Sequence, residues 1–137
     1  MSEVTIAAYL CVTPAIEAIA FYRDAFGAVE EARQTVPDGS LSHCRMRIGD
    51  ARFYLADQFP PTGWKSPPSI DGHSVGVQLE VDNPDELIGR ALAAGATLDR
   101  ELKEDDYGRW AIVVDPFGHY WTIVRTSEGF GTENVPA

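Results

Sequence analysis

The sequence has no long apolar run, few cysteines and few basic residues. None of its apolar stretches approaches the roughly 18 residues that a membrane-spanning helix needs, so we expect no membrane partner. Its 11 basic residues face 21 acidic ones, and the net charge of −10 argues against nucleic acid, whose phosphates an acidic surface repels. The two cysteines, Cys11 and Cys44, do not have the spacing of a zinc site and are expected to be free thiols.

The first residues carry neither a basic start nor a signal-type apolar segment. We therefore expect a cytoplasmic protein. Of the residues, 45% are hydrophobic and 23% are charged, which is typical of a packed core rather than a disordered chain. The length of 137 residues predicts a single domain over 1–137.

One pattern of strands, turns and caps occurs twice in the chain. In the first copy a strand is expected over 4–12, and a helix capped by Thr13 begins at Pro14 and ends at Gly27. Strands follow over 29–35, 41–48 and 52–56. In the second copy a strand is expected over 74–81, a helix is capped by Asn83 and ends at Gly95, and strands follow over 96–102 and 110–114. The turn at 115–118 then leads into a last strand.

The repeat predicts an α+β fold of two tandem βαβββ modules that form a curved, cleft-lined sheet. We place module one at about 4–57, a Pro-rich linker at about 58–72, module two at about 73–126 and a tail at 127–137. In this arrangement each sheet carries its helix on one face. Phe53 and Trp121 are expected in the core on the helix side, and the opposite faces are expected to line the cleft.

Two motifs are distinctive: Asp115-Pro116-x-Gly118-His119 before a strand, and the helix end Phe21-Tyr22-Arg23-Asp24-Ala25-Phe26-Gly27-Ala28. Both resemble motifs of the vicinal oxygen chelate superfamily, which includes glyoxalase I, extradiol dioxygenases, fosfomycin resistance proteins and bleomycin-binding proteins. The PhnB-like branch is similar in further motifs: Pro37-Asp38-Gly39, His43, Ile48-Gly49-Asp50, Leu55-Ala56-Asp57, Asp106-Tyr107-Gly108-Arg109 and Trp121. The resemblance implies the glyoxalase/bleomycin-resistance fold, but many chemistries share such a fold.

The resemblance also implies where a metal would be bound. Metal-using members place ligands on the first and last strand of each module, and the repeat carries those positions onto Ala7, Tyr54, Gly76 and Thr122. None is an imidazole, carboxylate or thiolate, so no metal and no other cofactor is expected. A shift in register would bring His73 to the site instead.

The predicted cleft faces contain aromatic rings beside a few polar groups, as small-molecule sites do. The candidate ligand-binding residues are Tyr9, His43, Arg45, Tyr54, Gln78, Tyr120 and Thr122. Alternation along 41–48 places His43, Arg45 and Arg47 on one face of the expected strand. His43 and Glu80 are the candidates for acid–base chemistry. The three tyrosines could equally fill an exposed sheet face or a dimer contact, and Cys11 is expected to serve packing rather than nucleophilic chemistry.

Two further residues each have two interpretations. Trp64, in the Pro-rich linker, either covers the cleft or anchors the linker. Arg109 either pairs with a surface carboxylate, which we favour, or binds an anionic substrate group.

These observations favour a protein that binds a small planar or aromatic molecule without the usual metal. The alternative is a metal-dependent lyase, isomerase or dioxygenase with an atypical ligand set of His43, His73 or Glu80. Both a binding protein and an enzyme remain open at this point. Open sheet edges and concave faces further predict a homodimer, in which one chain contributes residues to the cleft of the other.

Overall fold

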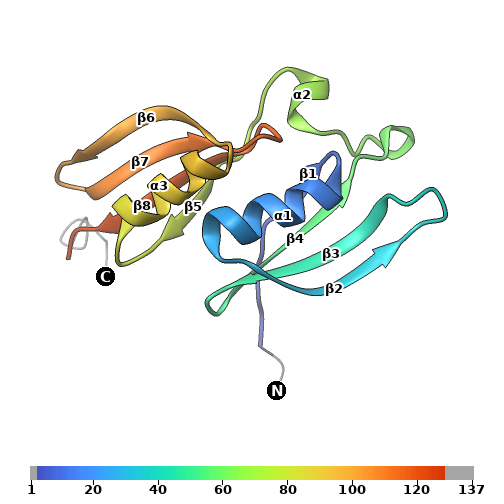
Figure 1. Ribbon diagram of the computed structural model, residues 1–137, viewed down its shortest axis with the longest axis horizontal. Coiled ribbons are helices and arrows are strands. Elements are labelled where there is room, and N and C mark those ends of the chain that lie inside the picture. Colours follow the sequence, from blue (N-terminus) through green and yellow to red (C-terminus); the bar gives the residue numbers. More distant parts are fainter. Residues whose placement is uncertain (1–2, 129–137) are drawn as a thin grey trace.

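The computed structural model describes residues 3–128 and consists of two four-stranded sheets, each covered by one helix (Figure 1). The first module contains β1 (Tyr9–Val12), α1 (Ala15–Phe26), β2 (Val29–Thr35), β3 (Leu41–Ile48) and β4 (Ala51–Asp57). A connecting segment contains the 3₁₀ turn η1 (Pro60–Thr62) and the single-turn helix α2 (Pro67–Ile70). The second module contains β5 (Val77–Glu80), α3 (Pro84–Ala94), β6 (Thr97–Glu104), β7 (Gly108–Val114) and β8 (Tyr120–Thr126).

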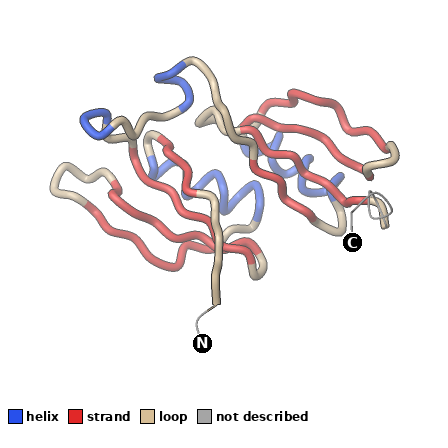
Figure 2. Tube along the Cα trace, turned by 180° about the vertical axis from the view of Figure 1, so that it is seen from behind, coloured by secondary structure: helices blue, strands red, loops and turns tan. Residues whose placement is uncertain are grey.

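The two sheets have the same topology. The strand orders are β1-β4-β3-β2 and β5-β8-β7-β6, with a parallel pair at one edge and antiparallel pairs elsewhere. This confirms the predicted α+β fold of two tandem βαβββ modules. Both helices lie in front of their sheets in Figure 1, and the strands face the viewer in Figure 2, which shows the back. The uncovered faces of the two sheets are therefore on the same side of the molecule.

The start of α1 differs from the prediction. Thr13 was expected to cap the helix, but Pro14 holds the cap position and offers no side-chain acceptor. Asp57, at the end of β4, supplies it: its Oδ1 accepts from the Ala15 amide at 2.9 Å and from the Thr13 hydroxyl at 3.2 Å. Its Oδ2 accepts from the Leu41 amide at 2.7 Å. One carboxylate thus joins α1, β3 and β4.

The start of α3 follows the prediction. The Asn83 Oδ1 accepts from the Glu86 amide at 3.3 Å, and Pro84 is the first helical residue. Gly95 ends the helix, as Gly27 ends α1. The helices pack against each other and bring the two modules together.

A single core runs through both modules. Phe53 and Trp121, which the alternation places on the helix side, are 5% and 1% exposed, as predicted. The Trp121 ring centroid lies 4.7 Å from that of Phe26 and 5.5 Å from that of Tyr22. Burial of these large rings supplies hydrophobic stabilisation to the contact between the modules.

The turn before β8 is held by a buried carboxylate. Asp115 Oδ1 accepts from the Phe117 and His119 amides, and Oδ2 accepts from the Trp121 indole at 2.9 Å. Gly118 has a φ of +92°, and a Cβ at this position would lie 2.8 Å from the Pro67 Cβ. Glycine is therefore required both by the backbone conformation and by the close approach of the connecting segment.

The first strands of both modules are shorter than predicted. Strands were expected over 4–12 and 74–81, whereas β1 begins at Tyr9 and β5 at Val77. Both are edge strands with a single neighbour, so alternation in sequence does not ensure pairing over the whole length. Val4 and Ile6 are consequently almost fully exposed. Among residues 3–128 no helix has the length and apolar character to span a membrane.

Candidate functional site

Three aromatic side chains meet on the uncovered face of the first sheet. Tyr9 on β1 lies opposite Tyr54 on β4, with ring centroids 5.6 Å apart. The His43 ring on β3 lies 5.3 Å from the Tyr54 ring and 5.7 Å from the Tyr9 ring. The Tyr9 hydroxyl is 2.9 Å from His43 Nδ1, and burial, with a smaller contribution from Cys44, raises the pKa of this hydroxyl. Tyr9 is therefore a neutral phenol that can hydrogen-bond His43.

The connecting segment adds a fourth ring to this group. Phe59 and Trp64 form a β-bridge around η1, with the Phe59 amide 2.7 Å from the Trp64 carbonyl oxygen. This small hairpin places the Trp64 indole edge-on to Tyr9 at 5.3 Å. We call Tyr9, His43, Tyr54 and Trp64 the aromatic cluster. Trp64 therefore holds the hairpin through its carbonyl group and contacts Tyr9 through its indole ring.

A cavity of about 980 Å³ adjoins the aromatic cluster. Tyr9 and Trp64 form part of its wall, which continues over the β2–β3 turn, the end of β4 and the connecting segment. The other lining residues are Val36, Pro37, Asp38, Ser40, Leu41, Ser42, Ala56, Asp57, Gln58, Phe59 and Thr62. Its wall comes from the first module and the connecting segment, whereas the sequence predicted a cleft between the two modules.

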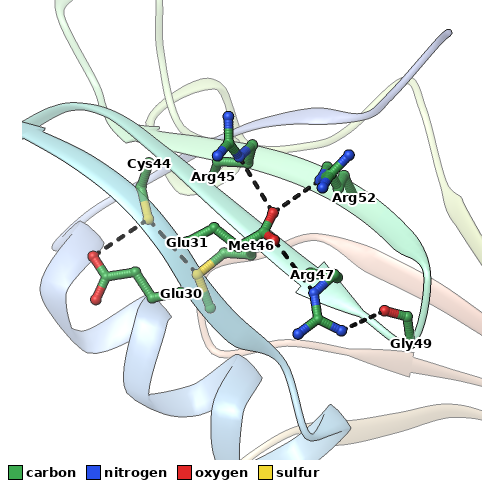
Figure 3. Close-up of polar contacts among 8 residues, drawn as sticks. All are labelled: Glu30, Glu31, Cys44, Arg45, Met46, Arg47, Gly49 and Arg52. Atoms are coloured by element: carbon green, nitrogen blue, oxygen red, sulfur yellow. Dashed lines mark hydrogen bonds and ion pairs between the residues drawn. The ribbon is translucent and has the colours of Figure 1, made fainter.

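Next to the aromatic cluster, three arginines surround one carboxylate (Figure 3). Glu31 on β2 accepts from the Nε–H groups of Arg45 at 3.2 Å, Arg47 at 3.3 Å and Arg52 at 2.9 Å. The hydrogen bond from Arg52, together with the neighbouring guanidinium charges, lowers the pKa of Glu31. We call these four residues the arginine–glutamate cluster.

Part of this cluster was missing from the sequence-based site. Alternation along β3 placed His43, Arg45 and Arg47 on one face, and the structure agrees. Glu31 and Arg52 were not singled out. A bulge between Glu30 and Ala32 interrupts the pairing of β2 with β3, so strand alternation alone does not identify Glu31 as their partner.

The remaining candidate residues lie on the second sheet. Thr122 lies opposite Gln78, whose side chain donates to Glu80 at 3.2 Å. The Tyr120 ring stacks on His73 with centroids 3.7 Å apart. Tyr120 and His73 line a smaller cavity of about 300 Å³, together with the connecting segment.

The predicted site residues therefore fall into two groups. Tyr9, His43, Arg45 and Tyr54 come together on the first sheet, and Gln78, Tyr120 and Thr122 lie on the second. Within residues 3–128, no hydrogen bond, ion pair or ring contact joins the groups. His43 and Glu80, the acid–base candidates, are accordingly in different groups.

The residues at the expected metal positions do not fit a divalent metal. Tyr54 is paired with Tyr9, and Thr122 is paired with Gln78. The other two expected positions, Ala7 and Gly76, lie just before β1 and β5. None of the four expected positions offers an imidazole, carboxylate or thiolate. Over the described range 3–128, no three His, Cys, Asp or Glu side chains are grouped to hold a metal ion.

The surroundings of Cys11 and Arg109 favour structural roles for both residues. Cys11 and Cys44 are buried, and desolvation raises the pKa of each thiol to about 11, so both are protonated and poor nucleophiles at neutral pH. Arg109 makes two hydrogen bonds of 2.7 Å to the Asp85 carboxylate, which is the surface ion pair favoured above.

Comparison with known proteins agrees with this architecture. An uncharacterized protein of Mycobacterium bovis is 41% identical over 98% of this chain and 91% of its own length. The crystal structure of an Arabidopsis thaliana gene product superposes with a TM-score of 0.73 at 22% identity, over 90% of this chain and all of that one.

A second structure is that of TnmS3, described as an antibiotic binding protein from Streptomyces, with a TM-score of 0.66 at 21% identity over 93% of this chain and all of that one. At these identities the two structures show a shared fold. The sequence profile of the glyoxalase/bleomycin resistance protein/dioxygenase superfamily matches residues 5–123. This match covers most of the chain, and the protein belongs to that superfamily.

Proposed function

We propose that this protein binds a small planar or aromatic molecule against the aromatic cluster, without a metal at the family's usual position. One observation carries the proposal: four rings from β1, β3, β4 and the connecting segment converge beside a cavity of about 980 Å³. Small-molecule sites combine such apolar walls with a few polar groups that fix orientation. The antibiotic-binding description of TnmS3 supports a binding role within the same fold.

The rings provide both surface and direction for a flat ligand. Tyr9 is 44% exposed and Trp64 is half-buried, so their faces and edges are accessible. The Tyr9–His43 hydrogen bond holds two of the rings in place before any ligand arrives. Such preorganisation reduces the entropy lost on binding.

The second-sheet candidates require a further assumption. Gln78, Tyr120 and Thr122 would join the site if the second sheet of one chain lay across the first sheet of its partner in a homodimer. Exposed apolar residues before both edge strands, Ile6 at 98% and Val75 at 72%, support such an assembly.

The experiment is a titration with a neutral planar probe, 2-naphthylmethanol, followed by ¹H–¹⁵N NMR. Tyr54→Leu should weaken binding about fivefold, because a ring–ring contact contributes about 1 kcal/mol and Tyr54 would contact the probe directly. Trp110→Leu removes an aromatic ring from the second module and should leave the affinity within about twofold. Equal affinity in wild type and Tyr54→Leu would refute the proposed site.

A metal-dependent lyase, isomerase or dioxygenase is the second candidate. The observation in its favour is His43, whose Nδ1 faces Tyr9 while its Nε2 has no hydrogen-bond partner among residues 3–128. Recruitment of His73 or Glu80 would require a different arrangement of the second sheet. This candidate predicts that a chelator abolishes an activity and that His43→Ala lowers metal content.

We also propose that the protein belongs to the PhnB-like branch of the superfamily. The Pro37-Asp38-Gly39 and Asp106-Tyr107-Gly108-Arg109 motifs support membership of the PhnB-like branch. They do not specify a reaction.

A further inference from the structure

The uncovered face of the first sheet carries an excess of positive charge, although the chain has a net charge of −10. In the arginine–glutamate cluster, three guanidinium groups meet one carboxylate, which leaves two positive charges in excess. The guanidinium groups come from β3 and β4 and surround the Glu31 side chain (Figure 3). This group of arginines therefore creates a local positive electrostatic potential on an otherwise acidic protein.

The arginines retain unused hydrogen-bond donors. Each directs its Nε–H group to Glu31, and Arg47 also donates from Nη1 to the Gly49 carbonyl at 2.8 Å. The terminal nitrogens of Arg45 and Arg52 make no hydrogen bond to residues 3–128, and these side chains are 41% and 55% exposed. Glu31 is only 19% exposed and holds the three side chains in position. The donors are therefore both oriented and accessible.

The arginine–glutamate cluster adjoins the aromatic cluster. Across the sheet, Tyr9 lies opposite Tyr54, and Tyr54 lies opposite Arg45. Side chains directly opposite each other on one face of a sheet are contact neighbours, with Cβ atoms about 5 Å apart. A single row therefore leads from two aromatic rings to a guanidinium group. A flat molecule of two fused rings has the size to cover this row.

We propose that the arginine–glutamate cluster is an anion subsite, and that the molecule bound on the aromatic cluster carries a carboxylate, sulfonate or phosphate group. This inference rests on the proposed function. The ring system stacks on Tyr9 and Tyr54, and its anionic group accepts hydrogen bonds from the terminal nitrogens of Arg45 and Arg52. A guanidinium group can donate two parallel hydrogen bonds to two oxygens of such an oxyanion.

Two probes of the same shape test the anion subsite: 2-naphthoate, which is anionic, and 2-naphthylmethanol, which is neutral. Wild-type protein should bind 2-naphthoate about tenfold more tightly, because hydrogen bonds to charged groups contribute more than neutral ones. The preference should fall as salt is raised from about 20 mM to about 300 mM. Arg45→Gln and Arg52→Gln should each remove most of the preference while binding of the neutral probe stays within about twofold.

Arg33→Gln is a matched control. Its side chain is 41% exposed, as that of Arg45 is, and it too pairs with a glutamate on β2. Its partner Glu30 lies by the buried Cys44 thiol rather than beside the aromatic cluster. The substitution changes the net charge by the same amount and should leave both affinities unchanged. An equal effect of Arg33→Gln and Arg45→Gln would show only a general charge effect and would overturn the inference.

The outcomes separate this inference from the proposed function. If both probes bind equally and Tyr54→Leu weakens both, the aromatic site stands and the anion subsite is wrong. If 2-naphthoate binding depends on Arg45 but not on Tyr54, the anion subsite stands and the aromatic site is wrong. If neither probe binds at millimolar concentration, both are wrong. If Arg45→Gln changes the sedimentation coefficient but not probe binding, the arginines serve a contact between two copies of the chain, and the inference fails.

Discussion

The Tyr22 hydroxyl donates to the Asp115 carboxylate across the two modules, over 2.5 Å and 93 residues of sequence. Tyr22 lies on α1 in the first module, and Asp115 begins the turn before β8 in the second. Both are almost completely buried. This bond connects the shared hydrophobic core to a buried carboxylate that accepts four hydrogen bonds.

Tyr22→Phe should lower the free energy of unfolding by about 2 kcal/mol, because it removes a buried hydrogen bond to a charged group. Urea unfolding at pH 7 measures this change. Tyr120→Phe is the control, since the Tyr120 hydroxyl makes no hydrogen bond within residues 3–128 and its ring stays stacked on His73. A loss equal to that of the control would show that the Tyr22–Asp115 bond contributes no net stability.

The same variant predicts a difference at alkaline pH. Burial, together with the Asp115 carboxylate, raises the pKa of Tyr22 well above its usual range. A tyrosine with a raised folded-state pKa contributes stability that is complete below about pH 10, the unfolded value, and is lost as the pH rises further. The difference between wild type and Tyr22→Phe should therefore be constant from pH 7 to about pH 9 and shrink above about pH 10. A difference that grows with pH would contradict this assignment.

Asp57→Ala should destabilise the first module by about 2–3 kcal/mol, because it leaves the Ala15 and Leu41 amides without their acceptor. Thr13→Ala removes the exposed hydroxyl, which donates to the same carboxylate and accepts a long bond of 3.4 Å from the Gln58 amide, and should cost about 1 kcal/mol or less. Chemical denaturation of both variants compares the two losses. Similar losses would mean that the Asp57 carboxylate does not cap α1.

The helix caps formed by Asn83 and Asp57 show which features local sequence patterns predict and which they do not. The Asn83 cap was predicted because its acceptor and donor are three residues apart. The Asp57–Ala15 cap joins residues 42 positions apart, so no local pattern contains it. Pro67-Pro68 was assigned to a linker, yet prolines at the first helical positions begin α2.

The candidate site was predictable strand by strand but not as a whole. Alternation placed His43 and Arg45 on one face of β3. The pairing of Tyr54 with Arg45 depends on the strand order β1-β4-β3-β2, and the position of Trp64 depends on the η1 hairpin. Local periodicity carries neither piece of information. The large cavity consequently lies beside the first module and not between the modules.

Ligand binding should be visible at a single indole resonance. The Trp110 indole N–H donates to Asp105, and the Trp121 indole N–H donates to Asp115, whereas Trp64 lies against Tyr9 in the cavity wall. In ¹H–¹⁵N spectra with 2-naphthylmethanol, only the Trp64 indole signal should shift strongly, and Trp64→Phe assigns it. A larger shift at Trp110 would place the probe on the second module.

Untagged protein purified without a chelator should contain less than about a tenth of an equivalent of any transition metal, because the expected ligand positions lack imidazole, carboxylate and thiolate groups. Mass spectrometry of the metal content measures this. Near one equivalent would support the metal-dependent enzyme. His43→Ala, His73→Ala and Glu80→Gln would then identify the ligands.

The protein should sediment as a homodimer at tens of micromolar. Val4 and Ile6 are 97% and 98% exposed beside the free edge of β1, where a second copy could cover them. Ile6→Asp should weaken the dimer by at least about tenfold. Thr5→Asp is the control: it adds the same charge at an already polar position and should weaken the dimer less. Monomeric wild-type protein at this concentration would disprove the assembly.

If the arginine–glutamate cluster binds anions as proposed, the charge distribution around it predicts selection by the size of the anion. At physiological salt, a surface charge acts over about 8 Å, so a small anion that reaches this face experiences mainly the local excess of arginine. A long polyanion extends beyond that distance and meets the acidic remainder of a chain with net charge −10. The same protein can thus attract a single carboxylate while it repels a polymer of phosphates.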